Sequence, residues 1–140
     1  MVASPCLCNA LRQASRAVTR LYDNELRGVG LRTTQYSLMR YLKHFDVVRQ
    51  RDLGAMTSLD ETTLTRNLRP LIDAGWVAFD TGEDRREKLV RLTNSGAAKL
   101  VKALPAWQRA QERMRAKLPK ANWSSLLALL PDIVRLADEA

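Results

Sequence analysis

The sequence contains no apolar run long enough to span a membrane, and its first residues lack the basic start and apolar stretch of a secretion signal. A membrane-spanning helix needs roughly 20 consecutive apolar residues. The missing run predicts a soluble protein with no membrane partner. Together the two absences favour a cytoplasmic location.

The sequence also lacks the motifs of the common enzyme classes. It has no glycine-rich phosphate loop with its lysine, no zinc-protease helix motif, and a single histidine to serve as a general base. Its two cysteines, Cys6 and Cys8, are too close for an ordinary structural disulfide and too few for a zinc site. We therefore expect two reduced thiols and no enzyme, no metal and no cofactor.

What the chain does have is a hydrophobic content of 46% and a strong positive charge. Its 140 residues suit one domain, residues 1–140. The net charge of +8 favours a polyanionic partner, because each lysine or arginine set against a phosphate releases a condensed counterion. Charge alone does not distinguish DNA from RNA or an anionic membrane, so the placement of the basic residues must decide.

Hydrophobic periodicity predicts a mainly α protein with a small β-hairpin. The expected helices cover about residues 5–26, 33–44, 50–56, 60–73, 94–118 and 122–138, with Thr33 placed to cap the second of them. A short strand is expected at 47–48 and a hairpin of strands at 76–80 and 88–92. The first and last helices carry apolar stripes that one copy leaves uncovered. We therefore expect residues 5–46 and 94–140 to hold two copies together as a homodimer around a central lobe at 47–93.

Residues 50–73 supply the parts of a helix-turn-helix: a short helix, a brief turn and a second helix that Asp60 is placed to cap. Leucines form one face of the second helix, and hydroxyls and guanidiniums suited to phosphates and base edges form the other. The competing interpretation is an ordinary amphipathic surface helix. The predicted DNA contacts on the polar face are Thr62, Thr63, Thr65, Arg66 and Arg69.

The tip of the hairpin adds a second basic element, Asp84-Arg85-Arg86. The negative potential of a narrow minor groove attracts guanidinium groups, so Arg85 and Arg86 are predicted to reach it. Asp84 is placed to hold one of the two arginines. The competing interpretation is a basic turn without function. Taken together, the hairpin tip and the helix predict a double-stranded DNA operator as the partner.

Several short motifs together resemble the multiple-antibiotic-resistance regulator (MarR) family of winged-helix repressors. They are Leu53-Gly54, Thr63-Leu64-Thr65-Arg66, Ala74-Gly75-Trp76-Val77, Asp84-Arg85-Arg86 and Leu92-Thr93-Asn94-Ser95-Gly96. The resemblance implies that the recognition helix enters the major groove, that Arg86 of the Asp-x-Arg motif enters the minor groove, and that the terminal helices make the dimer. It therefore predicts a winged helix-turn-helix, with a small β-hairpin wing, as the DNA-binding lobe at 47–93. It also predicts a homodimeric repressor on a pseudo-palindromic operator.

The segment around Cys8 resembles the organic-hydroperoxide-sensing branch of this family, whose reactive cysteine falls on Cys8. A helix N-terminus stabilises a thiolate, the form that peroxides oxidise, and Cys6 is a candidate to resolve the product. Arg12 stands where that branch has a supporting tyrosine. The competing interpretation makes both cysteines small apolar fillers in a helix stripe.

The alternative signal is a small aromatic inducer lodged between the first two helices and the DNA-binding lobe, with Arg12, Arg16 and Tyr36 as its pocket residues. Two other functions stay open: a thiol-dependent redox protein using Cys6 and Cys8, and a winged helix that binds protein. Redox activity that persists without Arg66 and Arg86 would favour the first, and duplex binding that never depends on Arg86 would favour the second.

Overall fold

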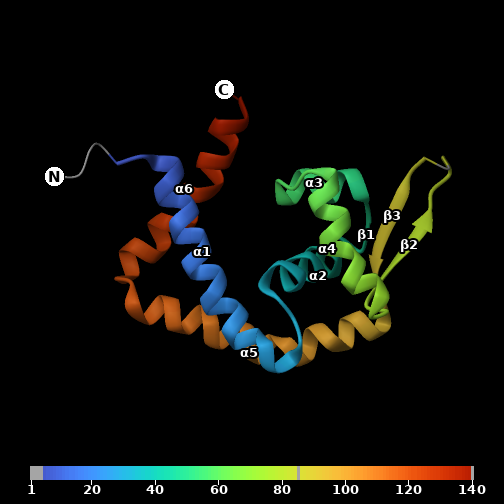
Figure 1. The fold of residues 1–140 in the computed structure, drawn as a ribbon, viewed down its shortest axis with the longest axis horizontal. Helices are drawn as coiled ribbons and strands as arrows, with labels where there is room; N and C mark the ends of the chain where they lie inside the picture. The colour runs from blue at the N-terminus through green and yellow to red at the C-terminus, as the bar shows by residue number, and fades with distance from the viewer. Residues whose placement is uncertain (1–4, 85, 140) are drawn as a thin grey trace.

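The computed structural model describes residues 5–84 and 86–139, and it confirms a mainly helical chain with a small antiparallel sheet. Figure 1 shows an arm built from α1, α6 and one end of α5, a compact lobe, and the β2–β3 hairpin projecting beyond the lobe. In chain order the elements are α1 (Leu7–Leu26), η1 (Arg27–Val29), α2 (Thr33–Phe45), β1 (Val47–Arg49), α3 (Gln50–Thr57), α4 (Glu61–Asp73), β2 (Val77–Thr81), β3 (Lys88–Leu92), α5 (Asn94–Lys117) and α6 (Lys120–Glu139).

No helix in either described range is both long and apolar enough to cross a membrane.

The sheet has the strand order β1-β3-β2, and both pairings are antiparallel. Val90 of the central strand lies opposite Val48 on one side and Phe79 on the other. Strand β2 begins one residue later than predicted because the Trp76 N–H donates to the Leu71 carbonyl at 2.9 Å and so closes the end of α4. The hairpin is therefore joined to the end of α4.

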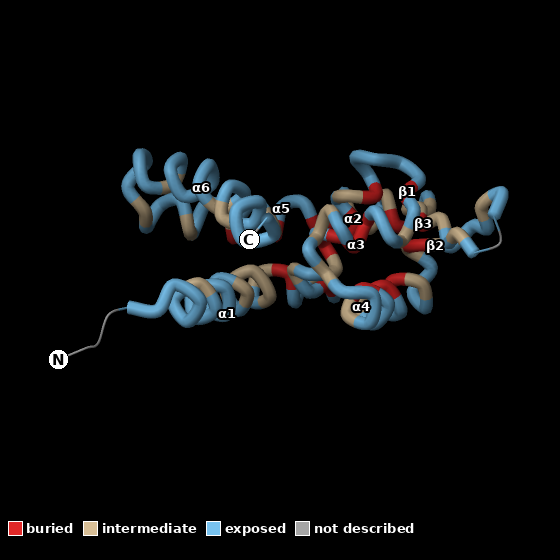
Figure 2. Tube along the Cα trace, turned by 90° about the horizontal axis from the view of Figure 1, so that it is seen from above, coloured by how far each residue is buried: buried red, intermediate tan, exposed pale blue. Residues whose placement is uncertain are grey.

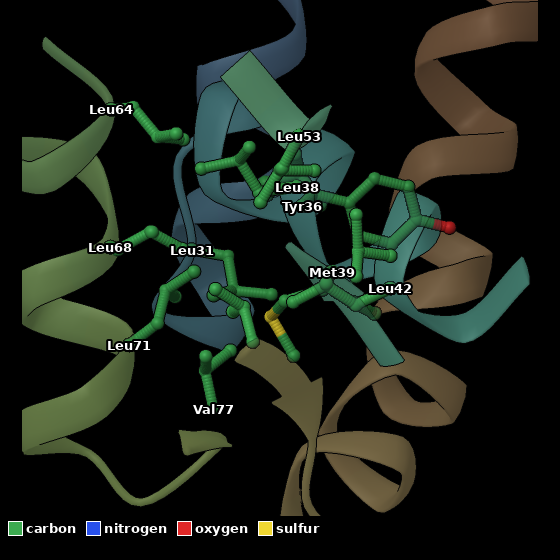
Figure 3. Close-up of a cluster of buried hydrophobic side chains, with 14 of the residues drawn as sticks. Leu31, Tyr36, Leu38, Met39, Leu42, Leu53, Leu64, Leu68, Leu71 and Val77 are labelled. Carbon is green, nitrogen blue, oxygen red and sulfur yellow. The ribbon is translucent and has the colours of Figure 1, made fainter. Parts of the chain in front are cut away.

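The core lies between α4, α2 and the sheet (Figure 3). Leu64, Leu68 and Leu71 of α4 point into it and are each at most 1% exposed. Met39 and Leu31 face them from α2 and the loop before it. The spacing of the leucines puts them on one stripe of the helix, so the predicted apolar face of α4 is confirmed.

The starts of α4 and α2 compare differently with the prediction. Asp60 is the N-cap of α4, as expected. The prediction that Thr33 caps α2 is wrong by one residue, because Arg32 occupies the cap and Thr33 is the first helical residue. The reason is tertiary: the Asp23 carboxylate on α1 accepts the Thr33 N–H at 2.7 Å and satisfies a donor that a local cap would otherwise serve.

The arm helices keep much of their apolar surface in solvent. Leu7 of α1 is 64% exposed, and α6 has no buried residue among those described (Figure 2). The exposed large apolar side chains of α6 are Leu126, Leu127, Leu129, Val134 and Leu136. Helix α6 thus exposes an unusual number of large apolar side chains for a single copy of the chain.

An ion-pair cluster attaches α1 to α5. Glu25 accepts hydrogen bonds from Arg113 at 3.0 Å and Arg109 at 3.2 Å, and the neighbouring Tyr22 hydroxyl donates to Gln111. The bond from Arg113 and then the bond from Arg109 hold the pKa of Glu25 below its ordinary value of 4.5. The carboxylate therefore favours the folded state only while it is charged.

This cluster predicts a defined pH dependence of stability. Because the pKa of Glu25 is lower in the folded state, its contribution is complete above pH 4.5 and is lost as the pH falls through the folded pKa. Glu25→Gln should therefore lower the melting temperature at neutral pH, and the gap from wild type should close below pH 4.5. Thermal unfolding across pH measures this, with the exposed Glu112→Gln as control. A constant gap would contradict the assignment.

Candidate nucleic-acid interface

The start of α4 is held by its cap. The Asp60 carboxylate accepts the Thr63 N–H at 2.7 Å, and this bond, followed by one from the Thr63 side chain and the nearby charge of Arg66, lowers the pKa of Asp60. Thr63 is half-buried at this cap. The other predicted contacts on the helix are exposed on its outer face: Thr62, Thr65, Arg66 and Arg69.

Close packing of α3 against the turn fixes where α4 begins. A Cβ on the buried Gly54 would lie 3.2 Å from the Leu59 carbonyl oxygen and 3.5 Å from Leu64 Cδ2. Ser58 between the helices adopts the left-handed conformation, with φ 56°. The Leu59 N–H closes the turn by donating to the Gly54 carbonyl at 3.0 Å. The two helices are thus set as a helix-turn-helix requires.

The tip of the wing is organised by Asp84. Its carboxylate accepts the backbone N–H of Arg86 at 3.0 Å, and its carbonyl accepts the Glu87 N–H at 2.9 Å. Asp84 therefore holds the backbone of the turn, and the exposed Arg86 side chain stays available to a partner. Arg85 lies outside the described residues.

Two ion pairs brace the strands that carry this tip. Asp80 and Arg91 pair across β2 and β3 at 2.7 Å, and Glu87 approaches Arg49 of β1 at 3.6 Å. All four side chains are at least a third exposed, so each pair adds little to stability. Their effect is on geometry, because the first pair joins the two strands of the wing and the second ties the wing to β1, the strand that precedes α3.

The wing tip and the start of α4 border the same hollow, which has a volume of about 600 Å³. The sequence predicted Arg86 as a DNA contact but did not predict four residues from β1, α3 and β3 that line this space with it: Arg49, Gln50, Arg51 and Lys88. The signal available in the sequence was the polar run Arg49-Gln50-Arg51 at the start of the first helix of the helix-turn-helix. Basic groups from three elements thus converge beside the recognition helix.

The residues proposed for signal sensing are distributed differently. Cys6 and Cys8 are free and exposed at the start of α1, and Arg12 and Arg16 are exposed further along it. Tyr36 is buried, and its ring stacks on Trp107 with a centroid distance of 6.0 Å. Its cationic neighbour is Arg40 of α2, 5.9 Å from the ring centroid. The structure thus pairs Tyr36 with groups on α2 and α5.

Comparison with known proteins identifies the arrangement. The sequence model of the MarR family matches residues 29–87, which hold the helix-turn-helix and most of the wing. The "Uncharacterized HTH-type transcriptional regulator YwoH" of Bacillus subtilis is 30% identical over 93 residues, covering 66% of this chain and 68% of that protein. The chain belongs to the MarR family. The predicted family is therefore confirmed, and the protein is a DNA-binding transcriptional regulator.

Solved structures agree with this MarR assignment. The M. tuberculosis regulator MosR in complex with DNA has a TM-score of 0.88 and 31% identity, with 96% of this chain and 98% of MosR covered. A cysteine-to-serine mutant of E. coli MarR complexed with operator DNA has a TM-score of 0.81 but 23% identity, with 91% and 92% covered, and shows the shared fold. Family and fold are those of transcriptional regulators.

Two MarR-like motifs meet at one structural joint. The Thr93 hydroxyl accepts the Gly96 N–H at 3.0 Å as the cap of α5 and donates to the Gly75 carbonyl at 2.6 Å. The Thr93 N–H donates to the Trp76 carbonyl at 2.9 Å. These residues therefore connect the end of α4, the wing and α5.

Proposed function

We propose that this MarR-family protein is a homodimeric repressor that occupies a pseudo-palindromic operator. The observation that carries this proposal is the hollow shared by Arg86 of the wing and the start of α4. Two grooves of one duplex can be read from this arrangement, with recognition helices about 34 Å apart in successive major grooves. The DNA-bound MosR structure, similar along nearly the whole chain, supports a duplex as partner.

Each element has a distinct part in this proposal. Residues on the outer face of α4 contact base edges and phosphates, and Thr63 contacts phosphate from the first turn. Arg86 enters the minor groove, with Asp84 fixing the turn, and Arg85 is proposed as a second contact of the wing with DNA. The major-groove set is Thr62, Thr65, Arg66 and Arg69.

The homodimer follows from the uncovered arms. The start of α1 and helix α6 lie at the same end of the molecule, away from the wing (Figure 1), and both carry exposed apolar side chains, Leu7 among them. A second copy buries both stripes around a two-fold axis and matches operator symmetry. A dimer is therefore expected by sedimentation at micromolar concentration, and a monomer would contradict this part of the proposal.

Arg86→Ala tests the function directly. Loss of the minor-groove guanidinium should weaken binding to a selected operator by about 1 to 3 kcal/mol, because the side chain is exposed and has no structural duty in the turn. The measurement is a fluorescence-anisotropy titration against a duplex enriched from a random pool, repeated at several salt concentrations.

Lys43→Ala is the matched control, since it removes the same charge from the exposed surface of α2. If both variants lose affinity equally, the effect is one of net charge and Arg86 is not a groove contact. If wild type enriches no sequence from the pool, the repressor proposal itself fails.

Release from the operator is proposed to follow oxidation of Cys8 or binding of a small inducer that changes the spacing of the two lobes. Cys8 lies in the first turn of α1, where oxidants reach it. Cys6 precedes the helix in extended backbone, with φ −87° and ψ 117°, so it is free of the helical geometry. This position suits a resolving thiol better than one within the helix.

Cys8→Ser should abolish peroxide-induced release while leaving operator affinity in reductant unchanged, because a hydroxyl is not oxidised by peroxide. Electrophoretic mobility shift with increasing organic hydroperoxide measures the release. Cys6→Ser is the companion variant and should still form the sulfenic acid without a disulfide. Normal release of Cys8→Ser would leave the inducer as the signal.

A further inference from the structure

Gln50 makes a contact with the recognition helix that nothing in the charge pattern explains. It is the first residue of α3, and its Nε2 lies 3.2 Å from the Oγ1 of Thr65, fifteen residues later on α4. Among the described residues, this is the one side-chain hydrogen bond between the two helices. Thr65 is exposed on the face of α4 assigned to DNA.

The other end of the Gln50 amide decides which way the group points. Gln50 Oε1 is buried and has no hydrogen-bond partner among the described residues. Turning the amide over would put an NH₂ with two donors in that buried position in place of one carbonyl oxygen. Buried unpaired N–H groups are rarer than under-satisfied carbonyls, so the observed orientation, with NH₂ toward Thr65, is favoured.

We propose that Gln50 is a positioning residue that makes Thr65 a hydrogen-bond donor toward the operator. A threonine hydroxyl on DNA serves equally as donor or acceptor. With one lone pair of Thr65 accepting from Gln50, its own proton is directed outward to an acceptor on the duplex. That acceptor is a phosphate oxygen or an acceptor atom of a base edge.

Arg49, next to Gln50 in the chain, strengthens this assignment. It approaches Glu87, at the tip end of the wing, at 3.6 Å, while Gln50 contacts α4. The junction of β1 and α3 thus contacts both the wing and α4. A residue at this junction is well placed to orient a contact without touching DNA itself.

The inference rests on the proposed function, and a double-mutant cycle tests it. Gln50→Ala and Thr65→Val should each weaken binding to the enriched duplex about two- to tenfold, the range for one hydrogen bond. The double variant should bind no worse than Thr65→Val alone, because Gln50 acts through Thr65. Gln50→Ala with Thr62→Val is the control pair and should be additive, since Thr62 is on the same face without this bond.

Gln50→Glu separates orientation from support. A carboxylate only accepts hydrogen bonds, so the Thr65 hydroxyl would donate to the side chain at position 50 instead of receiving a bond from it. The hydroxyl proton would then point away from the acceptor on the duplex. Its affinity loss should exceed the loss that the same change causes in a Thr65→Val background, where only the added charge acts. Base-pair substitutions in the duplex then locate the acceptor: a base contact changes discrimination at one pair, and a phosphate contact changes affinity uniformly.

Additive losses in the Gln50 and Thr65 cycle, with wild-type binding intact, would overturn the inference alone. Equal losses for Gln50→Glu in both backgrounds would do the same. Failure of the wild type to enrich any duplex would overturn the proposed function and the inference with it. Melting temperatures of all variants confirm that the compared proteins are folded.

Discussion

Gly96→Ala is expected to destabilise the protein by about 3 kcal/mol or more, the upper end for overpacking a buried site. A Cβ at this position would overlap the carbonyl oxygen of Trp76, lie 2.9 Å from its carbonyl carbon and lie 2.7 Å from Leu92 Cδ1. The nearest of these atoms belong to backbone that is itself hydrogen-bonded to Thr93. Relief therefore requires α5 to move away from the wing.

Gly28→Ala is the matched control, because a Cβ there meets nothing within 4 Å. Removing a glycine in an open, compatible conformation stabilises by about 0.4 to 1 kcal/mol through the unfolded chain. Urea denaturation of both variants measures the contrast. Equal midpoints for Gly96→Ala and wild type would show that the joint between the wing and α5 adjusts without cost.

At the same joint, residues that resemble family motifs stabilise the fold, which the resemblance alone did not indicate. The motifs around Gly75 and Thr93 identified the family correctly, but their residues have structural roles. The Thr93 hydroxyl caps α5 and also donates to the Gly75 carbonyl at the end of α4. Function was better indicated by Asp84 and Arg86, where a carboxylate fixes a turn and leaves a guanidinium exposed.

The recognition helix was predictable because its determinants are local. The spacing of Leu64, Leu68 and Leu71 defines a buried face at helical period, and Asp60 caps the first turn within three residues of its partner. The first residue of α2 was not predictable in this way. Asp23, ten residues earlier on another helix, accepts the N–H of Thr33 in place of a local cap. Local rules fail where a tertiary partner replaces a local one.

The contacts around the candidate site followed the same division. The outward residues of α4 could be listed from the sequence, but the bond from Gln50 to Thr65 depends on how α3 crosses α4. The stack of Tyr36 on Trp107 joins α2 to α5 across a large sequence separation. No period or motif encodes such pairs, because they arise only when the helices pack.

Leu68→Ala is expected to cost about 2 to 5 kcal/mol of folding stability, through lost burial and the cavity left behind. Leu68 is 0% exposed and points from α4 into the core beside Leu71 and Leu31 (Figure 3). The neighbouring Arg69 is exposed on the outer face. Adjacent positions of one helix therefore serve stability and DNA binding separately.

The pair gives a reciprocal experiment. Leu68→Ala should lower the denaturation midpoint while the folded fraction keeps much of its operator affinity. Arg69→Ala should leave the free energy of unfolding within about 0.5 kcal/mol of wild type, as surface changes usually do. It should weaken operator binding. Denaturation and anisotropy titration on the same preparations measure both effects. If Arg69→Ala lost stability and kept its affinity, the outer face of α4 would be a structural surface, and the major-groove assignment would have to move to another element.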